Sequence, residues 1–103
     1  MLIDSHCHLN YKGLVEDQTG AIARAKAAGV SLMLNISTRE SEWQDVIAVA
    51  EADAAVWATV GIHPHEADAH PGVDAARLVK AAEHPRVVGI GESGLDYYYD
   101  HSD

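Results

Sequence analysis

The stretch that decides the fold lies near the end of the chain and reads Gly91-Glu92-Ser93-Gly94-Leu95-Asp96-Tyr97-Tyr98. It follows the apolar run at residues 87–90, so a charged cluster begins where a short buried strand is expected to end. The same arrangement occurs twice upstream. Residues 1–3 lead into His6-Cys7-His8, and residues 56–62 lead into His63-Pro64-His65. Polar clusters after successive apolar strands are typical of a site built at the carboxyl ends of parallel strands.

The segments between the expected strands have the apolar spacing of helices. Residues 18–28 predict a first helix that ends at Gly29, and residues 31–36 predict the next strand. A second helix is expected after Ser41-Glu42-Trp43-Gln44, which has the form of a capping box, with an apolar stripe at Trp43, Val46, Ile47 and Ala50. Residues 74–82 predict a third helix with Leu78, Val79 and Ala82 on one side.

The order of these elements predicts an α/β fold. Strands begin near residues 1, 31, 56 and 87, close to the spacing of about 31 residues per unit in a (β/α)8 barrel of roughly 250 residues. We therefore expect the N-terminal half of a TIM barrel, with four parallel strands and three intervening helices. Strands that are apolar without strict alternation are typical of a sheet covered on both faces.

The domain organisation follows from the number of strands. Four strands cannot close a barrel, and no helix is expected after the fourth. Residues 1–103 are therefore interpreted as a partial hydrolase domain that supplies barrel strands 1 to 4, with the remainder absent. The alternative is a complete small α/β domain.

Composition limits the possible functions. The 103 residues carry 16 acidic and 7 basic side chains, for a net charge of -9, which argues against a surface that coats nucleic acid. It leaves a nucleic-acid enzyme possible, because metal ions would supply local positive charge. The single cysteine rules out an intrachain disulfide and is compatible with a cytoplasmic protein. No apolar run is long enough to predict a membrane span.

His6 and His8 are the first candidate metal ligands. Residues two apart in an extended strand point to the same side, so both imidazoles would reach one ion while Cys7 points away. The alternative is a pair of exposed polar residues in a loop. Asp4 has the same parity and is expected either to orient a ligand histidine or to serve as a turn residue.

Glu92 and His63 are the candidate catalytic residues. A carboxylate at the carboxyl end of a barrel strand indicates catalysis or metal binding, and its two oxygens suit it to bridge two ions. The alternative for Glu92 is a helix-initiating residue on a solvated loop. His63 is a candidate to bind a phosphate oxygen or to transfer a proton, or else it is structural, as we prefer for His65. Asp96 either accepts a hydrogen bond from a ligand or forms a turn.

The three motifs together resemble the signatures of the TatD family of metal-dependent deoxyribonucleases. The resemblance rests on residues 4–9, 61–65 and 91–98, in that order along the whole chain. It implies a metallo-dependent hydrolase of the TIM-barrel type, found in the cytoplasm, that trims DNA, often from the 3′ end and on single strands. It also implies a site with two divalent metal ions, whether Mg²⁺, Mn²⁺ or Zn²⁺.

The resemblance further implies roles for individual residues. His6 and His8 would bind one metal, Glu92 would bridge the pair, and His63 would lie near the scissile phosphate. The family also uses two later histidines and a late aspartate from strands beyond the fourth. We therefore expect the 103-residue chain alone to be inactive, with DNA as the substrate of the complete protein. Because four strands leave the sheet open, we also expect the chain to self-associate through its exposed strand edges.

Two alternatives to the nuclease interpretation stay open. One is another metallo-hydrolase acting on esters or amides, including a deacylase of D-aminoacyl-tRNA. Relatives of the amide-hydrolysing kind often carry a carboxylated lysine at the fourth strand, whereas this chain has Glu92 there and no lysine after Lys80. The other is a half-barrel without catalytic activity that binds metal or a partner.

Overall fold

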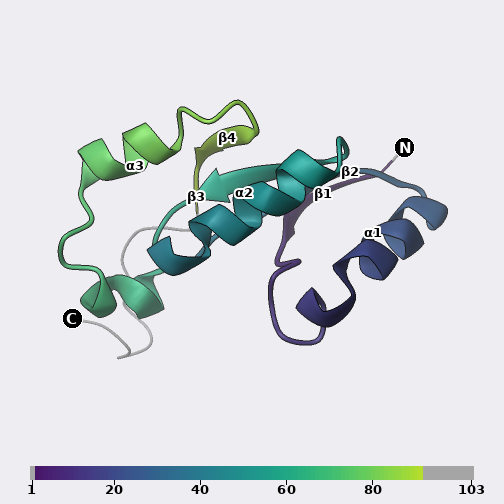
Figure 1. The fold of residues 1–103 in the computed structure, drawn as a ribbon, viewed down its shortest axis with the longest axis horizontal. Helices are drawn as coiled ribbons and strands as arrows, with labels where there is room; N and C mark the ends of the chain where they lie inside the picture. The colour runs from purple at the N-terminus through teal and green to yellow at the C-terminus, as the bar shows by residue number, and fades with distance from the viewer. Residues whose placement is uncertain (1, 92–103) are drawn as a thin grey trace.

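The computed structural model describes residues 2–91, which form one sheet packed against helices (Figure 1). The sheet has the order β1-β2-β3-β4, and all neighbouring strands are parallel. Its strands are β1 (Leu2–Cys7), β2 (Val30–Asn35), β3 (Val56–Val60) and β4 (Val87–Ile90). The connecting helices are α1 (Gln18–Ala27), α2 (Trp43–Ala52) and α3 (Ala75–Ala81). The predicted arrangement of four parallel strands with three intervening helices is confirmed.

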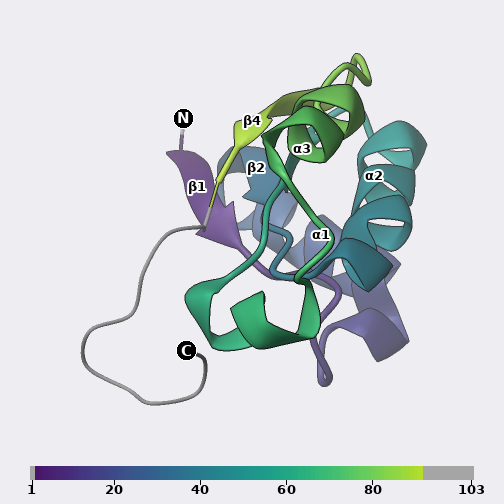
Figure 2. The ribbon, with the colours of Figure 1, turned by 90° about the vertical axis from the view of Figure 1, so that its left-hand side faces the viewer.

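The three helices lie on the same side of the sheet (Figure 2). Right-handed crossovers between strands that are adjacent in both sequence and space place every helix on one face. Within residues 2–91 the helices cover one face, and cover of the other face stays a prediction for the complete barrel. Large apolar side chains on the strands remain exposed, namely Leu2, Ile3, Leu32, Val88 and Ile90.

The core lies between the sheet and α2. The predicted stripe of Trp43, Val46, Ile47 and Ala50 is buried, as expected for a helix with apolar residues on one face. It packs against the strand residues Met33, Val56, Ala58 and Val60. The Trp43 indole also donates a hydrogen bond to the carbonyl of Gly61, 3.1 Å away, so the core helix is tied to the end of β3.

Local signals explain where the helices begin and end. The Asp17 carboxylate accepts a hydrogen bond from the Gly20 amide, and Asp74 accepts one from the Arg77 amide, so each caps the helix that follows. Gly29 has a φ of 101°, which favours glycine and stops α1 as predicted. No helix within residues 2–91 has the length and apolar character needed to cross a membrane.

Three details differ from the sequence prediction. The Ser41 capping box is wrong, because α2 begins at Trp43 and the Glu42 carboxylate bonds backward to residues 38 and 39. Val79 faces solvent, because consecutive residues lie about 100° apart on a helix and Leu78 takes the inner position. Three short 3-10 helices were not predicted: η1 (Val15–Asp17), η2 (Glu40–Glu42) and η3 (Pro64–Ala69).

Candidate metal and nucleic-acid site

The candidate site lies at the carboxyl edge of the sheet. β1 ends at Cys7 and β3 at Val60, so His6 and His8 lie at the end of one strand and His63 follows the end of another. Only β2 separates these two strands, which places their ends roughly 10 Å apart. The parallel sheet therefore gathers the predicted histidines on one edge, as the motif order indicates.

His6 and His8 lie close together. Their ring centroids are 5.0 Å apart, with an angle of 77° between the ring planes. β1 runs to Cys7, further than the predicted strand at residues 1–3, so the extended backbone that brings His6 and His8 to one side is present. Two imidazoles at this separation suit two positions in the coordination shell of one divalent ion.

A hydrogen bond orients His8, and an aromatic ring lies against it. Its Nδ1 lies 3.2 Å from the carbonyl oxygen of Ile36. A carbonyl only accepts, so this hydrogen bond places the proton on Nδ1 and leaves Nε2 with the lone pair that a metal requires. The ring of Tyr11 stacks on the ring of His8, with centroids 4.3 Å apart and planes 14° from parallel. The hydrogen bond to Ile36 therefore gives His8 the tautomer and the orientation typical of a metal ligand.

Cys7 and Asp4 both stabilise this strand end, Cys7 from the core side and Asp4 from the exposed side. Cys7 packs against the core, and its thiol donates to the carbonyl of Leu34. Burial, with a smaller effect from the charge of Asp4, raises the pKa of Cys7 to about 11, so the thiol stays protonated and is a poor nucleophile. The Asp4 carboxylate accepts a hydrogen bond from the amide of His6 at 3.1 Å. It thus fixes the backbone of a candidate ligand.

A buried polar network follows β2 and was not predicted from the sequence. The side chain of Asn35 accepts from the amide of Leu9 and donates to Asn10, so it fixes the loop after β1. The Ser37 hydroxyl donates to the carbonyl of Thr59 at 2.6 Å. One oxygen of Glu42 accepts from both the amide and the hydroxyl of Thr38. These hydrogen bonds fix the loop that follows β2 at the carboxyl edge of the sheet.

The same loop connects the two histidine motifs. The amide of Ile36 donates to the carbonyl of Cys7, and the amide of His63 donates to the carbonyl of Thr38 at 2.7 Å. His8 bonds to Ile36 at one end of this loop, and His63 bonds to Thr38 at the other. The ends of β1 and β3 are therefore held in one frame through residues 36–38.

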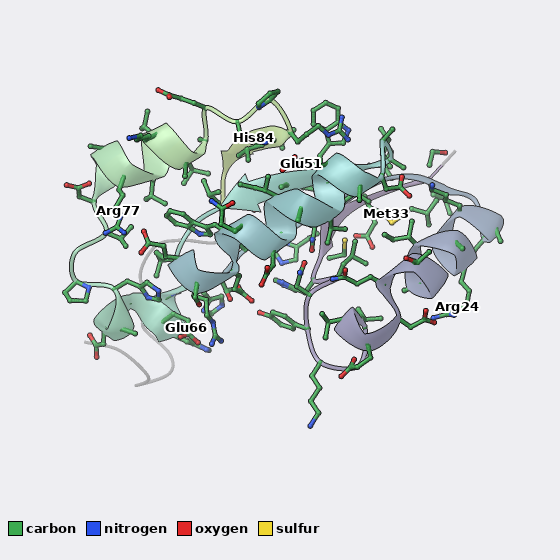
Figure 3. All side chains as sticks on the ribbon, in the orientation of Figure 1. Arg24, Met33, Glu51, Glu66, Arg77 and His84 are labelled. Atoms are coloured by element: carbon green, nitrogen blue, oxygen red, sulfur yellow. The ribbon has the colours of Figure 1, made fainter. Side chains whose placement is uncertain are left out.

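His63 caps the 3-10 helix η3. Its Nδ1 accepts a hydrogen bond from the amide of His65, and the two rings lie 4.4 Å apart. η3 is fastened to the loop after β2 by the ion pair between Arg39 and Glu66, at 3.1 Å. The imidazole of His70 adds a second link, because it accepts from the amide of Glu40. Figure 3 shows Glu66 on η3 at this edge.

The next strand approaches the site through two glycines. A side chain at Gly61 would overlap the carbonyl of Gly91, so only glycine lets β3 and β4 come this close. The buried Thr59 hydroxyl next to Gly91 has no hydrogen-bond partner among the described residues. Such a group is open to a water or ligand. Glu92 and Asp96, the other predicted site residues, lie outside the described residues.

The donor set present fits a divalent ion in part. Within residues 2–91, no group of three histidine, cysteine, aspartate or glutamate side chains is arranged to hold a metal. The His6–His8 pair supplies two nitrogen donors, which suit Zn²⁺, whereas carboxylate ligands added to them would suit Mn²⁺ or Mg²⁺. Further ligands must come from other residues, and Glu92 is the predicted one at this edge.

A groove in the described residues lies elsewhere. It has a volume of about 680 Å³ and runs between α1 and α2, with Ile22 and Val49 in its lining. The ion pair of Lys26 with Asp53 also borders it. It contains none of the candidate histidines, so we do not assign it to the chemistry.

Comparison with known proteins agrees with the motifs and the fold. The sequence model of one family, described as TatD related DNase, matches residues 3–103. The chain belongs to the TatD-related DNase family. The family resemblance inferred from the three motifs is therefore confirmed.

Individual TatD relatives show how much of the family domain is represented. The chain is 46% identical over 81 residues to a protein of Cronobacter turicensis named 3'-5' ssDNA/RNA exonuclease TatD, covering 79% of this chain and 31% of that protein. It is 36% identical over 100 residues to the uncharacterized metal-dependent hydrolase TatD of Mycobacterium tuberculosis, covering 95% and 38%. The chain thus spans about a third of the length of these relatives.

A solved structure in the TatD family confirms the fold. The crystal structure of YjjV, a TatD homologue from Escherichia coli, aligns with a TM-score of 0.86 and 33% sequence identity. The alignment covers 96% of this chain and 39% of YjjV. The four strands and three helices therefore correspond to the N-terminal part of a TatD-type barrel.

Proposed function

We propose that residues 1–103 are the first part of a metal-dependent nuclease that removes nucleotides from the 3′ ends of single-stranded DNA. The observation that carries the proposal is the His6–His8 pair, in which the contact of His8 with Ile36 leaves Nε2 as the metal-binding nitrogen. TatD relatives that carry the names exonuclease and metal-dependent hydrolase support it.

The proposed roles of the residues follow from their positions. His6 and His8 would hold one divalent ion, and Glu92 would bridge it to a second. His63, fixed by its bond to Thr38, would bind a phosphate oxygen of the substrate. Asp4 would keep the backbone of His6 in place, and Asp96 would orient a ligand or its loop. Bound divalent ions supply electrostatic stabilisation for in-line attack of water on a phosphodiester.

The 103-residue chain by itself is proposed to be inactive. Its described residues contribute two adjacent histidines and no group of three metal donors. The relatives named as nucleases or hydrolases are about three times as long as the matched segment, and the proposed activity belongs to a protein of that length. RNA is the second candidate substrate, because the Cronobacter turicensis relative is named for both ssDNA and RNA.

A product-length experiment tests the proposal. The intact protein is treated with EDTA and then given Mg²⁺ or Mn²⁺, with a 5′-labelled single-stranded DNA 20-mer and its RNA counterpart as substrates. We expect a ladder that shortens one nucleotide at a time from the 3′ end, only after metal is restored. Glu92→Gln should lower the rate at least 100-fold, because it removes a charge that the two ions share.

The matched control is His84→Asn. His84 precedes β4 and pairs with Glu51 at 3.5 Å on the helical side, away from the carboxyl edge (Figure 3). The His84→Asn variant should therefore shorten the DNA 20-mer at the wild-type rate. Wild-type activity in Glu92→Gln would remove the bridging role, and cleavage in EDTA would contradict the metal dependence.

A further inference from the structure

The loop between β1 and α1, residues 8–15, holds an aromatic ring at the candidate metal site. The ring of Tyr11 stacks on His8, and its amide donates to the carbonyl of His8 at 3.2 Å. The carbonyl of Tyr11 accepts from the amides of Leu14 and Val15, at 3.0 and 2.9 Å. The backbone of Tyr11 is therefore fixed on both sides, and the ring has a defined position beside a predicted ligand.

The residue Tyr11 is not buried by this contact. It is 43% exposed although it contacts His8, and Leu14 and Val15 in the same loop are similarly exposed. An aromatic residue that served only to pack against the metal ligand His8 would be expected to be buried. Exposed ring surface next to a candidate phosphodiester site is a stacking surface for a base, and every base has a face that can stack.

The same loop carries a cation that has no ion pair with a carboxylate among the described residues. Of the seven Lys and Arg residues, four form ion pairs, and Arg86 lies over Trp57 and bonds to three carbonyls. Lys12 and Lys80 have neither kind of contact within residues 2–91. Lys80 is on α3, whereas Lys12 adjoins Tyr11. Of the two cations without such contacts among the described residues, Lys12 is the nearer to His6 and His8 in sequence, in a chain of net charge -9.

We propose that the 8–15 loop binds the 3′-terminal nucleotide of the substrate, with Tyr11 stacked on the terminal base and Lys12 in contact with a phosphate. The inference rests on the proposed function and deepens it. Stacking on Tyr11 requires a base that has left its duplex neighbours, which selects single-stranded ends. It also tolerates all four bases, so no sequence preference arises at the terminal position.

An abasic substrate tests the stacking contact. Two 5′-labelled single-stranded 20-mers are compared in the intact, metal-loaded protein, one with a normal 3′-terminal nucleotide and one with an abasic 3′-terminal residue. For the wild type we expect a KM about tenfold higher for the abasic strand, with little change in kcat. Tyr11→Leu should abolish this difference, and Tyr11→Phe should retain it.

Salt dependence tests the Lys12 contact. Removing one phosphate contact lowers the slope of log binding against log salt by about 0.7 for a single strand. We expect Lys12→Gln to show this decrease and Lys80→Gln to keep the wild-type slope. Titration of the metal-free protein with Mn²⁺ should give the same affinity for wild type and Tyr11→Leu, which separates a substrate contact from support of His8.

The outcomes distinguish the two proposals. If the wild type hydrolyses neither strand, the proposed nuclease function fails and this inference falls with it. If both strands are hydrolysed with equal KM, or if Tyr11→Leu keeps the wild-type difference, the stacking role alone is overturned. Tyr11→Leu could instead bind Mn²⁺ more weakly and hydrolyse both strands equally slowly. That result would overturn the stacking role and show that Tyr11 only positions His8.

Discussion

Gly61 shows how a single residue position controls the distance between two strands of the site. Any side chain there would overlap the carbonyl of Gly91, whose amide donates to the carbonyl of Val60. Gly61→Ala should therefore push β4 away and lower the free energy of unfolding by about 1–3 kcal/mol. Urea unfolding followed by tryptophan fluorescence measures the change, since Trp43 bonds to Gly61.

Gly89→Ala is the matched control for this prediction. Gly89 lies in β4, and a side chain there would meet nothing within 4 Å. Its unfolding midpoint should fall by much less than that of Gly61→Ala. Equal midpoints for the two variants would show that contact with Gly91 does not limit position 61.

The residues of the candidate site differ in how far the sequence predicts them. The approach of His6 to His8 follows from strand alternation alone, which any extended segment obeys. The roles of Asn35 and Thr38 do not, because their partners are fixed by the fold: Asn35 bonds to Leu9, 26 positions away. Tyr11 was missed for a similar reason, since a lone aromatic in a loop gains meaning only from its stacking on His8.

At the scale of elements, apolar periodicity predicts the regular helices and strands well. The stripe of α2 and the stop of α1 at Gly29 are local signals that predicted their elements, whereas the caps Asp17 and Asp74 were found only in the structure. The 3-10 helices were missed because a turn of three to six residues has no periodicity to detect. The predicted capping box was misplaced, because the side chain that bonds back to the backbone here is Glu42, to the amide of Arg39, and not Gln44.

Arg86 holds the amino end of β4 to the end of α2. Its guanidinium donates to the carbonyls of Ala50, Ala54 and Val56 and lies 3.7 Å from the ring centre of Trp57. Lysine lacks the planar fork that makes these contacts together. Arg86→Lys should lower the free energy of unfolding by about 1–3 kcal/mol in urea titrations.

Arg24→Lys provides the comparison for Arg86→Lys. Arg24 forms only an exposed ion pair with Asp17, for which the expected contribution is below about 1 kcal/mol. It should therefore unfold close to the wild type. Equal losses for Arg86→Lys and Arg24→Lys would contradict the proposed clamp.

The ion pair of Lys26 with Asp53 links α1 to the end of α2 and predicts a pH dependence. The Lys26 hydrogen bond, followed by that of the Ala55 amide, lowers the pKa of Asp53 below its ordinary value of 3.8. The ionised carboxylate thus favours the folded state, and this contribution is complete above about pH 4–5. It is lost as the pH falls through the lowered pKa.

Unfolding of Lys26→Met as a function of pH checks whether this contribution to stability is lost at low pH. At pH 7 the variant should be less stable than the wild type by under about 1 kcal/mol, because the pair is partly exposed. The difference should shrink as the pH falls below 3.8. Lys80→Met, which removes a cation that has no ion pair within residues 2–91, should show no such convergence. A gap for Lys26→Met that is unchanged at pH 2 would refute the assignment.

At the scale of the whole molecule, the described residues have one covered and one uncovered sheet face (Figure 2). Strands β1 and β4 each have one neighbour, and apolar residues such as Ile3 and Val88 are exposed. The 103-residue chain should therefore self-associate, as sedimentation velocity at increasing concentration will show. Val88→Lys should weaken this association.

Val79→Lys is the matched control for the association test. Val79 is 55% exposed and Val88 is 56% exposed, but Val79 lies on α3 and Val88 on β4. Only the strand variant should shift the sedimentation profile toward the monomer. A monomeric wild type at all concentrations, or equal effects of the two variants, would contradict association through the sheet.

The central claim is that the carboxyl edge of this sheet binds a metal through His6 and His8. The most direct test is equilibrium titration of the intact, metal-free protein with Mn²⁺, comparing wild type, His8→Asn and His84→Asn. Loss of a ligand should weaken binding at least tenfold in His8→Asn, while His84→Asn binds like the wild type. Identical isotherms for the wild type and His8→Asn would contradict the account.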